Sequence, residues 1–235
     1  FTPRASRTSE EFCADGRHGE FWVGARPSLE EMSESTGLRA RDLANLKDDL
    51  AAGEVTTTVL RGIDPQIDAL VDKVAPSRDE GHDVALEKRL SHVRMFKDDY
   101  ELEQIREATA ATKEGFERVI KALPGAIGRP RSERALEAAF GSAARELGNG
   151  VSFETIVASG NHANTLHWTE NTGTVQDGDL VLVDAGVELD SLYSADITRT
   201  FPANGKFTPA QARVYEAVLD AVEAGLAAAG KPGAV

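Results

Sequence analysis

Two aspartates in the last third of the 235-residue chain have the types and spacing of a metal site. Asp184 directly follows the apolar run 180–183, and Asp196 lies in the next segment with the composition of a strand. The residues between them let the chain fold back, so adjacent antiparallel strands would bring both carboxylates together. Paired carboxylates repel unless a cation lies between them, and hard oxygen ligands suit Mg²⁺ or Mn²⁺. The spacing leaves another interpretation open, in which Asp184 caps its strand and Asp196 pairs with Arg199.

The sequence around these aspartates resembles the metal-binding signature of Xaa-Pro aminopeptidases and prolidases. The resemblance is continuous over residues 155–220, and residues 7–24 are similar, more loosely, to the late part of the aminopeptidase P N-terminal domain. Residues 202–208 resemble the corresponding segment of bacterial aminopeptidase P, which favours aminopeptidase P over prolidase. The segments that carry the match are Asp184-Ala185-Gly186, 196–201 (DITRTF), 166–171 (LHWTEN), 177–183 (DGDLVLV) and 202–208 (PANGKFT).

The resemblance implies a pita-bread catalytic domain that holds two divalent metal ions, usually Mn²⁺. It implies that Asp184 binds one ion with both oxygens and that Asp196 bridges the two. His167 matches the family histidine that contacts the substrate and supports the tetrahedral intermediate, although a structural histidine beside Trp168 is the alternative. Thr198 is placed to orient the carboxylates. We interpret the other four histidines as surface residues: His18, His82, His92 and His162.

The activity implied by the resemblance is metal-assisted hydrolysis of the bond between an N-terminal residue and a following proline. Its substrates would be peptides with proline at the second position, and proline lacks the N–H that most peptidases require. Two alternatives stay open: a prolidase acting on dipeptides, and a non-catalytic pita-bread protein used for binding. A methionine aminopeptidase is disfavoured by the large unit before residue 97. The resemblance is also compatible with a homo-oligomeric full-length enzyme.

Composition restricts the remaining functions. The net charge of −13 disfavours nucleic-acid binding, which needs clustered Lys and Arg. No apolar run approaches the ~20 residues that span a bilayer, so we expect no membrane partner. Cys13 is the single cysteine, which favours a reducing, cytoplasmic setting. The chain starts at Phe1 and ends in a loop-like tail, so we expect a piece cut at both ends, with the family's further histidine and two glutamate segments beyond Val235.

The elements that must position these residues indicate an α/β (α+β) chain of two parts. Residues 1–96 would be a partial creatinase-like N-terminal α/β domain, and residues 97–235 the first half of a pita-bread domain. Asp98 or Asp99 would cap the first catalytic helix, and Thr208 with Gln211 would cap the last one, whose buried face would be Val214, Val218, Val222 and Leu226. The predicted helices are 38–50, 83–96, 102–123, 132–147 and the one after Thr208, and the predicted strands are 55–60, 151–158, 180–183 (covered on both faces) and 193–201.

Overall fold

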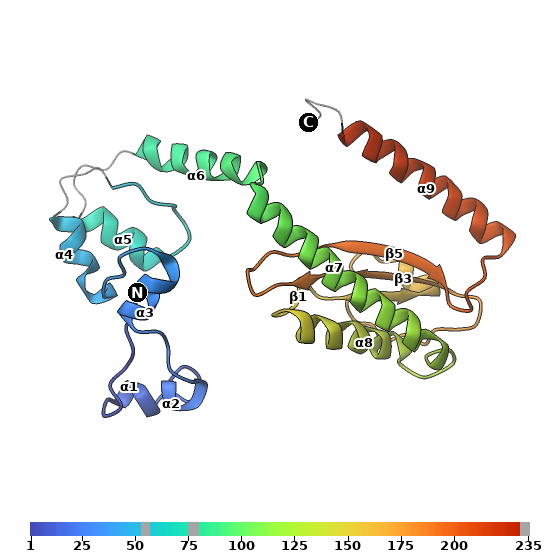
Figure 1. The fold of residues 1–235 in the computed structure, drawn as a ribbon, viewed down its shortest axis with the longest axis horizontal. Coiled ribbons are helices and arrows are strands. Elements are labelled where there is room, and N and C mark those ends of the chain that lie inside the picture. The colour runs from blue at the N-terminus through green and yellow to red at the C-terminus, as the bar shows by residue number, and fades with distance from the viewer. Residues whose placement is uncertain (53–56, 75–79, 231–235) are drawn as a thin grey trace. The chain divides into compact units, whose positions relative to one another are not determined.

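The computed structural model describes residues 1–52, 57–74 and 80–230 (Figure 1). The chain divides into two compact units, an N-terminal unit of residues 1–96 and a C-terminal unit of residues 97–235. The described parts contain no helix long and apolar enough to cross a membrane.

The regular elements in the described residues of the N-terminal unit are all helices, so the strand expected there is not observed. Thr56 and Val55 lie outside those residues, and residues 57–60 have no regular structure. A β-branched run needs a partner strand to become a strand itself; here the backbone N–H of Val59 donates instead to the carboxylate of Asp83, at 3.0 Å. The helices are α1 (Glu10–Cys13), α2 (Glu20–Val23), α3 (Leu29–Thr36), η1 (Leu43–Asn45), α4 (Leu46–Ala51), α5 (Pro65–Val74) and α6 (Glu80–Met95).

The helix predicted over residues 38–50 begins later than expected. The side chain of Asp42 accepts a hydrogen bond from the backbone of Ala44, which starts the short 3₁₀ turn η1 at Leu43 before α4 continues it. Residues 38–42 are therefore outside the helix. The prediction for residues 83–96 agrees with α6 within three residues at its start.

The C-terminal unit is a mixed helix–sheet unit. Its first helix starts with Asp98 as N-cap, one of the two caps predicted from the sequence, and the structure adds a capping box between Asp98 and Glu101. The predicted helix 132–147 is observed with the same bounds. Its elements are α7 (Asp99–Ala122), η2 (Leu123–Gly125), α8 (Ser132–Leu147), β1 (Gly150–Val151), β2 (Ile156–Ser159), η3 (Gly160–Asn164), β3 (Leu180–Ala185), β4 (Val187–Glu188), β5 (Ile197–Pro202) and α9 (Pro209–Ala229).

Three antiparallel strands form the main sheet in the order β2-β3-β5, and β1 pairs separately with β4. The predicted strand 151–158 is thus two strands, which pair with the two halves of one chain segment, β3 and β4. The break lies at Gly186, where an added Cβ would come within 1.7 Å of the carbonyl oxygen of Ala195. That close approach of two backbones is a tertiary contact, which a local pattern of residues does not reveal.

The core lies between the helices α7 and α8 and one face of the sheet. Phe116 of α7 and Phe140 of α8 meet edge-on at 5.8 Å between ring centroids. They pack with Val181 and Val183 of β3 in one buried cluster. Gly115 makes this contact feasible, because a Cβ there would lie 2.5 Å from the Phe140 ring.

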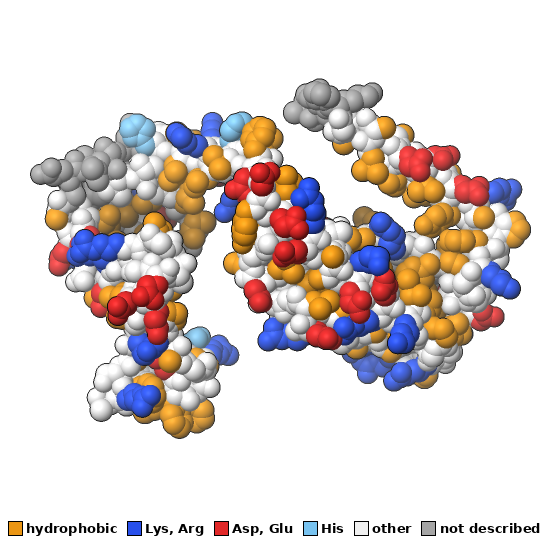
Figure 2. Space-filling view, viewed as in Figure 1, with side chains coloured by type: hydrophobic (Ala, Val, Ile, Leu, Met, Phe, Trp, Pro, Cys, Tyr) orange, Lys and Arg blue, Asp and Glu red, His pale blue; other side chains and the backbone are white. Residues whose placement is uncertain are grey.

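Two expectations about burial are wrong in this structure. Strand β3 is not covered on both faces, because Val181, Val183 and Ala185 are buried whereas Leu180, Leu182 and Asp184 are only half-buried. Helix α9 starts as predicted, with the Thr208–Gln211 capping box and Pro209 in the first turn. Its apolar stripe is exposed, however (Figure 2), because no described element covers it: Val214 64%, Val218 58%, Val222 51% and Leu226 68%.

Candidate functional site

Asp184 lies on β3, and Asp196 lies just before the neighbouring strand β5. Asp184 of β3 pairs directly with Thr198 of β5, and Asp196 immediately precedes β5. Residues two apart on a strand point to the same face, so Asp196 and Thr198 both project on the side of Asp184. The hydroxyl of Thr198 donates to a carboxylate oxygen of Asp184 at 2.7 Å, as expected for a residue that orients a ligand.

The electrostatics of the pair are compatible with a cation between the two carboxyl groups. Partial desolvation raises the pKa of Asp196, and the negative charge of Asp184 and a hydrogen bond to its carboxyl group raise it further. Two carboxyl groups this close are the arrangement in which a second ionisation is opposed until a positive charge lies between them. Their oxygens are the donors that hard divalent cations prefer, so the residues present fit such an ion.

The donor set is nevertheless small. Within residues 1–52, 57–74 and 80–230, no group of three or more His, Cys, Asp or Glu side chains could hold a metal ion. The aspartate pair could therefore supply at most part of a coordination sphere, and the family resemblance implies further ligands.

An open cavity of about 540 Å³ brings His167 to the aspartates. It is lined by Phe153, Glu154, Ile156, His167, Thr169, Asp184 and Asp196. His167 comes from the segment between η3 and β3, and its side chain is exposed. The structure thus brings together His167, Asp184 and Asp196 in one cavity, and Thr198 joins them through its hydrogen bond to Asp184.

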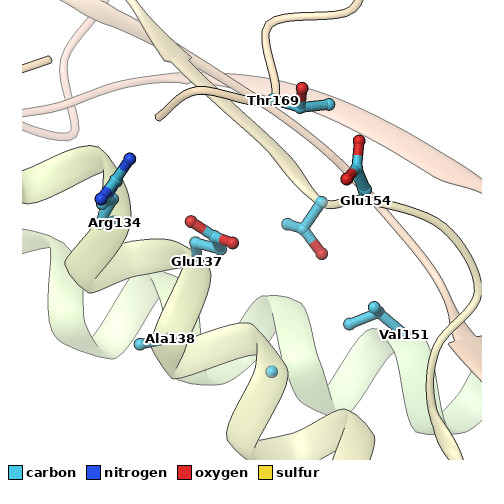
Figure 3. A pocket seen from close by; sticks show the side chains of 8 residues that line it. Arg134, Glu137, Ala138, Val151, Glu154 and Thr169 are labelled. Carbon is cyan, nitrogen blue, oxygen red and sulfur yellow. The ribbon is translucent and has the colours of Figure 1, made fainter. Parts of the chain in front are cut away.

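A second open cavity, of about 460 Å³, adjoins this one and shares Glu154 and Thr169 with it. In Figure 3, Arg134 and Glu137 of α8 project toward it from one side, and Glu154 and Thr169 lie on the other. The guanidinium of Arg134 donates to the carbonyl oxygen of Glu170, at 3.1 and 3.2 Å. The aspartate pair does not reach this second cavity.

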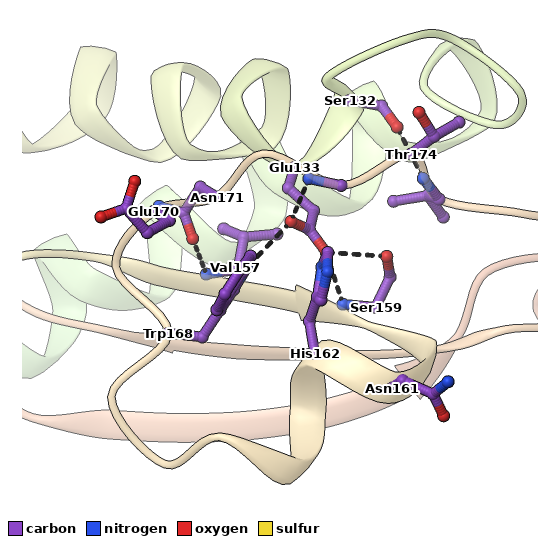
Figure 4. A network of polar contacts seen from close by, with 12 residues as sticks. Ser132, Glu133, Val157, Ser159, Asn161, His162, Trp168, Glu170, Asn171 and Thr174 are labelled. Atoms are coloured by element: carbon purple, nitrogen blue, oxygen red, sulfur yellow. Dashed lines mark hydrogen bonds and ion pairs between the residues drawn. The ribbon is translucent and has the colours of Figure 1, made fainter.

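The structure reveals one important residue that was not predicted, Glu133 in the first turn of α8. Its side chain is fully buried. Its carboxylate accepts hydrogen bonds from the backbone N–H and hydroxyl of Ser159, from the ring of His162, from the indole N–H of Trp168 and from the backbone N–H of Gly173 (Figure 4). A signal was available in the sequence, because Glu133 lies three and seven positions before Leu136 and Phe140 on the helix face predicted to be buried.

His162 is half-buried, with 36% of its side chain exposed, so its interpretation as a free surface residue is only partly right. Its ring nitrogen lies 2.9 Å from Glu133 and its ring stacks on Trp168 with 4.0 Å between centroids. The other three histidines interpreted as surface residues, His18, His82 and His92, are exposed as expected.

Glu133 is held as a carboxylate in spite of its burial. Desolvation alone would raise its pKa, but the hydrogen bonds from Trp168, His162, Ser159 and Gly173 outweigh that effect and hold the pKa below its ordinary value. A buried charge that receives several hydrogen bonds is stabilised where an unpaired one would be expelled.

Comparisons with known proteins agree with this arrangement. Residues 103–235 match metallopeptidase family M24. The chain is 48% identical over 233 residues to Xaa-Pro aminopeptidase 2 of Streptomyces coelicolor, covering 99% of this chain and 48% of the relative. It is 45% identical to Xaa-Pro aminopeptidase 1 of the same organism, covering 99% of this chain and 46% of that relative.

The structure is similar to solved structures of aminopeptidase P. A single-residue variant of the Escherichia coli enzyme in complex with substrate matches with a TM-score of 0.74 and 30% identity, covering 87% of this chain and 48% of that chain. These neighbours have the pita-bread fold, so the mixed α/β architecture expected from the sequence is confirmed. The chain spans about half the length of the relatives it matches.

Proposed function

Because this chain belongs to metallopeptidase family M24, we propose that it is part of an Xaa-Pro aminopeptidase, which hydrolyses the bond between an N-terminal residue and a following proline. The observation that carries the proposal is the pair Asp184 and Asp196, which shares one cavity with His167. The similarity to two aminopeptidases over 99% of the chain supports the choice of substrate class.

The aspartates are the proposed metal ligands. Enzymes of family M24 are dinuclear-metal hydrolases. Carboxylate oxygens suit hard divalent ions such as Mg²⁺ and Mn²⁺, and the family resemblance favours Mn²⁺. Such ions, when bound, supply Lewis acidity and lower the pKa of water in the cavity. The Thr198 hydroxyl keeps the carboxylate of Asp184 turned toward the cavity by its 2.7 Å hydrogen bond. The imidazole of His167 would donate a hydrogen bond to the substrate carbonyl oxygen as negative charge develops there.

The two units would have different roles. We assign residues 97–235 to part of the catalytic domain and residues 1–96 to part of an N-terminal domain. The substrates would be peptides with proline at the second position, and the full-length protein would be compatible with a homo-oligomer. The exposed, unpaired thiol of Cys13 supports a reducing compartment such as the cytoplasm.

The metal assignment can be tested on this chain directly. Asp184→Asn and Asp196→Asn should each weaken Mn²⁺ binding measured by calorimetry, because each removes a charged oxygen ligand. Asp190→Asn is the matched control, since Asp190 is exposed in the turn between the two strands. Equal Mn²⁺ binding by all three variants would contradict the assignment.

The activity can be tested in a chimera. This chain would replace the matched half of Xaa-Pro aminopeptidase 2 of Streptomyces coelicolor, and release of the first residue from an Xaa-Pro-Xaa peptide would be measured. We expect turnover that is lost in the Asp184→Asn chimera. Cleavage of Xaa-Pro dipeptides alone would favour the prolidase alternative, and a folded chimera without either activity would favour the binding protein.

A further inference from the structure

We propose that Glu133 is a positioning residue that fixes the place of His167 in the cavity through the loop of residues 159–173. This inference rests on the role proposed for His167. It concerns a carboxylate outside the cavity that holds the aspartate pair, and it explains how an exposed histidine could hold one orientation.

The tip of the loop has no packing of its own. Leu166 is 87% exposed, and Thr165 and His167 are exposed as well. A side chain in such a place is usually mobile, because nothing buried restrains it. The position of His167 must therefore be set by the anchors on either side of the tip.

Glu133 supplies those anchors. One carboxylate oxygen accepts from Ser159 at the start of the loop and from His162, at distances of 2.8–2.9 Å. The other accepts from Gly173 at the end of the loop, at 2.6 Å, and from Trp168, at 3.0 Å. A single buried group thus closes the loop at its base and also holds two points within it (Figure 4).

Trp168 connects the anchor to the histidine. It is one peptide bond from His167, its indole N–H is bonded to Glu133, and its ring is stacked on His162 at an interplanar angle of 24°. The backbone N–H of Thr169 donates a hydrogen bond to the carbonyl oxygen of His167 at 3.1 Å, which closes a three-residue turn centred on Trp168. Fixing the indole therefore restricts the backbone that carries the imidazole.

The hydrogen bonds that converge on Glu133 require a carboxylate at this position. Five donors converge on its two oxygens, and an ionised carboxylate offers about four lone-pair sites and no donor. A glutamine of the same shape would present an NH₂ group to one half of these donors, leaving them unpaired. Trp168 and Gly173 share one oxygen, so whichever oxygen becomes the NH₂, part of the loop loses its anchor.

The test follows the His167 ring itself by NMR. In the 235-residue chain with ¹³C-labelled histidine, the resonance of His167 is assigned by His167→Gln among the five histidines. We expect Glu133→Gln and Trp168→Phe each to displace or broaden the His167 resonance by clearly more than the control Glu137→Gln. Glu137 lies one turn further along α8 and outside the hydrogen bonds of Glu133, so it reports what a general change of charge on that helix does.

The outcomes separate positioning from stability. A Glu133→Gln chain that unfolds at a lower temperature but leaves the His167 resonance in place would overturn the proposal, since that is what a purely structural carboxylate would do. If Glu133→Gln does not fold, Trp168→Phe decides, because it keeps the carboxylate and removes one donor; an unchanged His167 resonance there would overturn the proposal as well. No metal or substrate is present in this experiment, so the NMR result can be interpreted even if the proposed function is wrong.

Discussion

At the scale of single residues, the carboxylates in and near the site have two different electrostatic environments. Glu133 is buried and surrounded by hydrogen-bond donors, so its negative charge is fully compensated within the protein. Asp196 faces Asp184, so its charge is opposed by a neighbour of the same sign. The first arrangement stabilises a loop, and the second favours the presence of a cation between the two carboxyl groups.

The close contact between Gly173 and Glu133 leads to a stability prediction. A Cβ at residue 173 would lie 2.5 Å from the Glu133 carboxylate, so Gly173→Ala should lower the free energy of unfolding by roughly 1–3 kcal/mol. The control is Gly141→Ala in α8, where a Cβ meets nothing within 4 Å. This substitution should raise the free energy of unfolding by about 0.5–1 kcal/mol. Urea denaturation of both variants measures the difference. Equal effects would show that the loop shifts to accommodate the added methyl group, and would contradict the prediction.

The lowered pKa of Glu133 predicts how stability depends on acid. A carboxyl group whose folded-state pKa is depressed stabilises the protein fully above its ordinary value of 4.5 and loses that contribution as the pH falls through the folded value. The free energy of unfolding should therefore fall below about pH 4.5, and it should fall less steeply in Glu133→Gln, which has no proton to bind. Denaturant titrations between pH 3 and 7 test this; parallel curves would mean that other carboxyl groups cause the acid loss.

At the scale of elements, local signals were predictable from the sequence and contacts between distant segments were not. Thr208 was identified as a cap because a capping box involves residues three apart, and Asp98 was one of two adjacent aspartates predicted as the cap of the first helix. The division of the strand at residues 152–155 was missed because its cause lies at Gly186 and Ala195. The hydrogen-bond network of Glu133 was missed for the same reason, because its donors belong to four residues of the segment 159–173, distant in the sequence. His167, Asp184 and Asp196 were found through the family resemblance, and spacing alone had left two interpretations of the aspartates open.

The exposed stripe of helix α9 predicts self-association of this chain. Val218 and Val222 are more than half exposed, and an apolar stripe of this kind promotes association. Val218→Asp with Val222→Asp should reduce the association measured by sedimentation velocity, with little effect on the free energy of unfolding because neither side chain is buried. Ala217→Asp with Ala224→Asp adds the same charge away from the stripe and should leave association nearly unchanged. If both pairs act alike, net charge rather than the stripe controls association.

At the scale of the whole molecule, the chain carries a recognisable site on about half the length of its relatives. The sheet face that bears Asp184 is the face on which Leu180 and Leu182 are only half-buried. The covered face packs against α7 and α8 in one apolar cluster. The half-covered face thus combines the carboxylates with apolar surface.

We finally predict that residues 1–235, purified as they stand, will not hydrolyse Xaa-Pro peptides at the rate of a complete family member. The aspartate pair provides two carboxylates, and the described residues hold no group of three or more His, Cys, Asp or Glu side chains that could bind a metal. An ion held by so few ligands would be bound weakly and positioned loosely, and displacement of the reacting groups by about 1 Å can cost ~10²-fold in rate. The measurement is release of the first residue from an Xaa-Pro-Xaa peptide with added Mn²⁺, with the chimera described above assayed at the same concentration. Equal turnover by the two proteins would mean that residues outside the proposed set, or a second copy of the chain, complete the site.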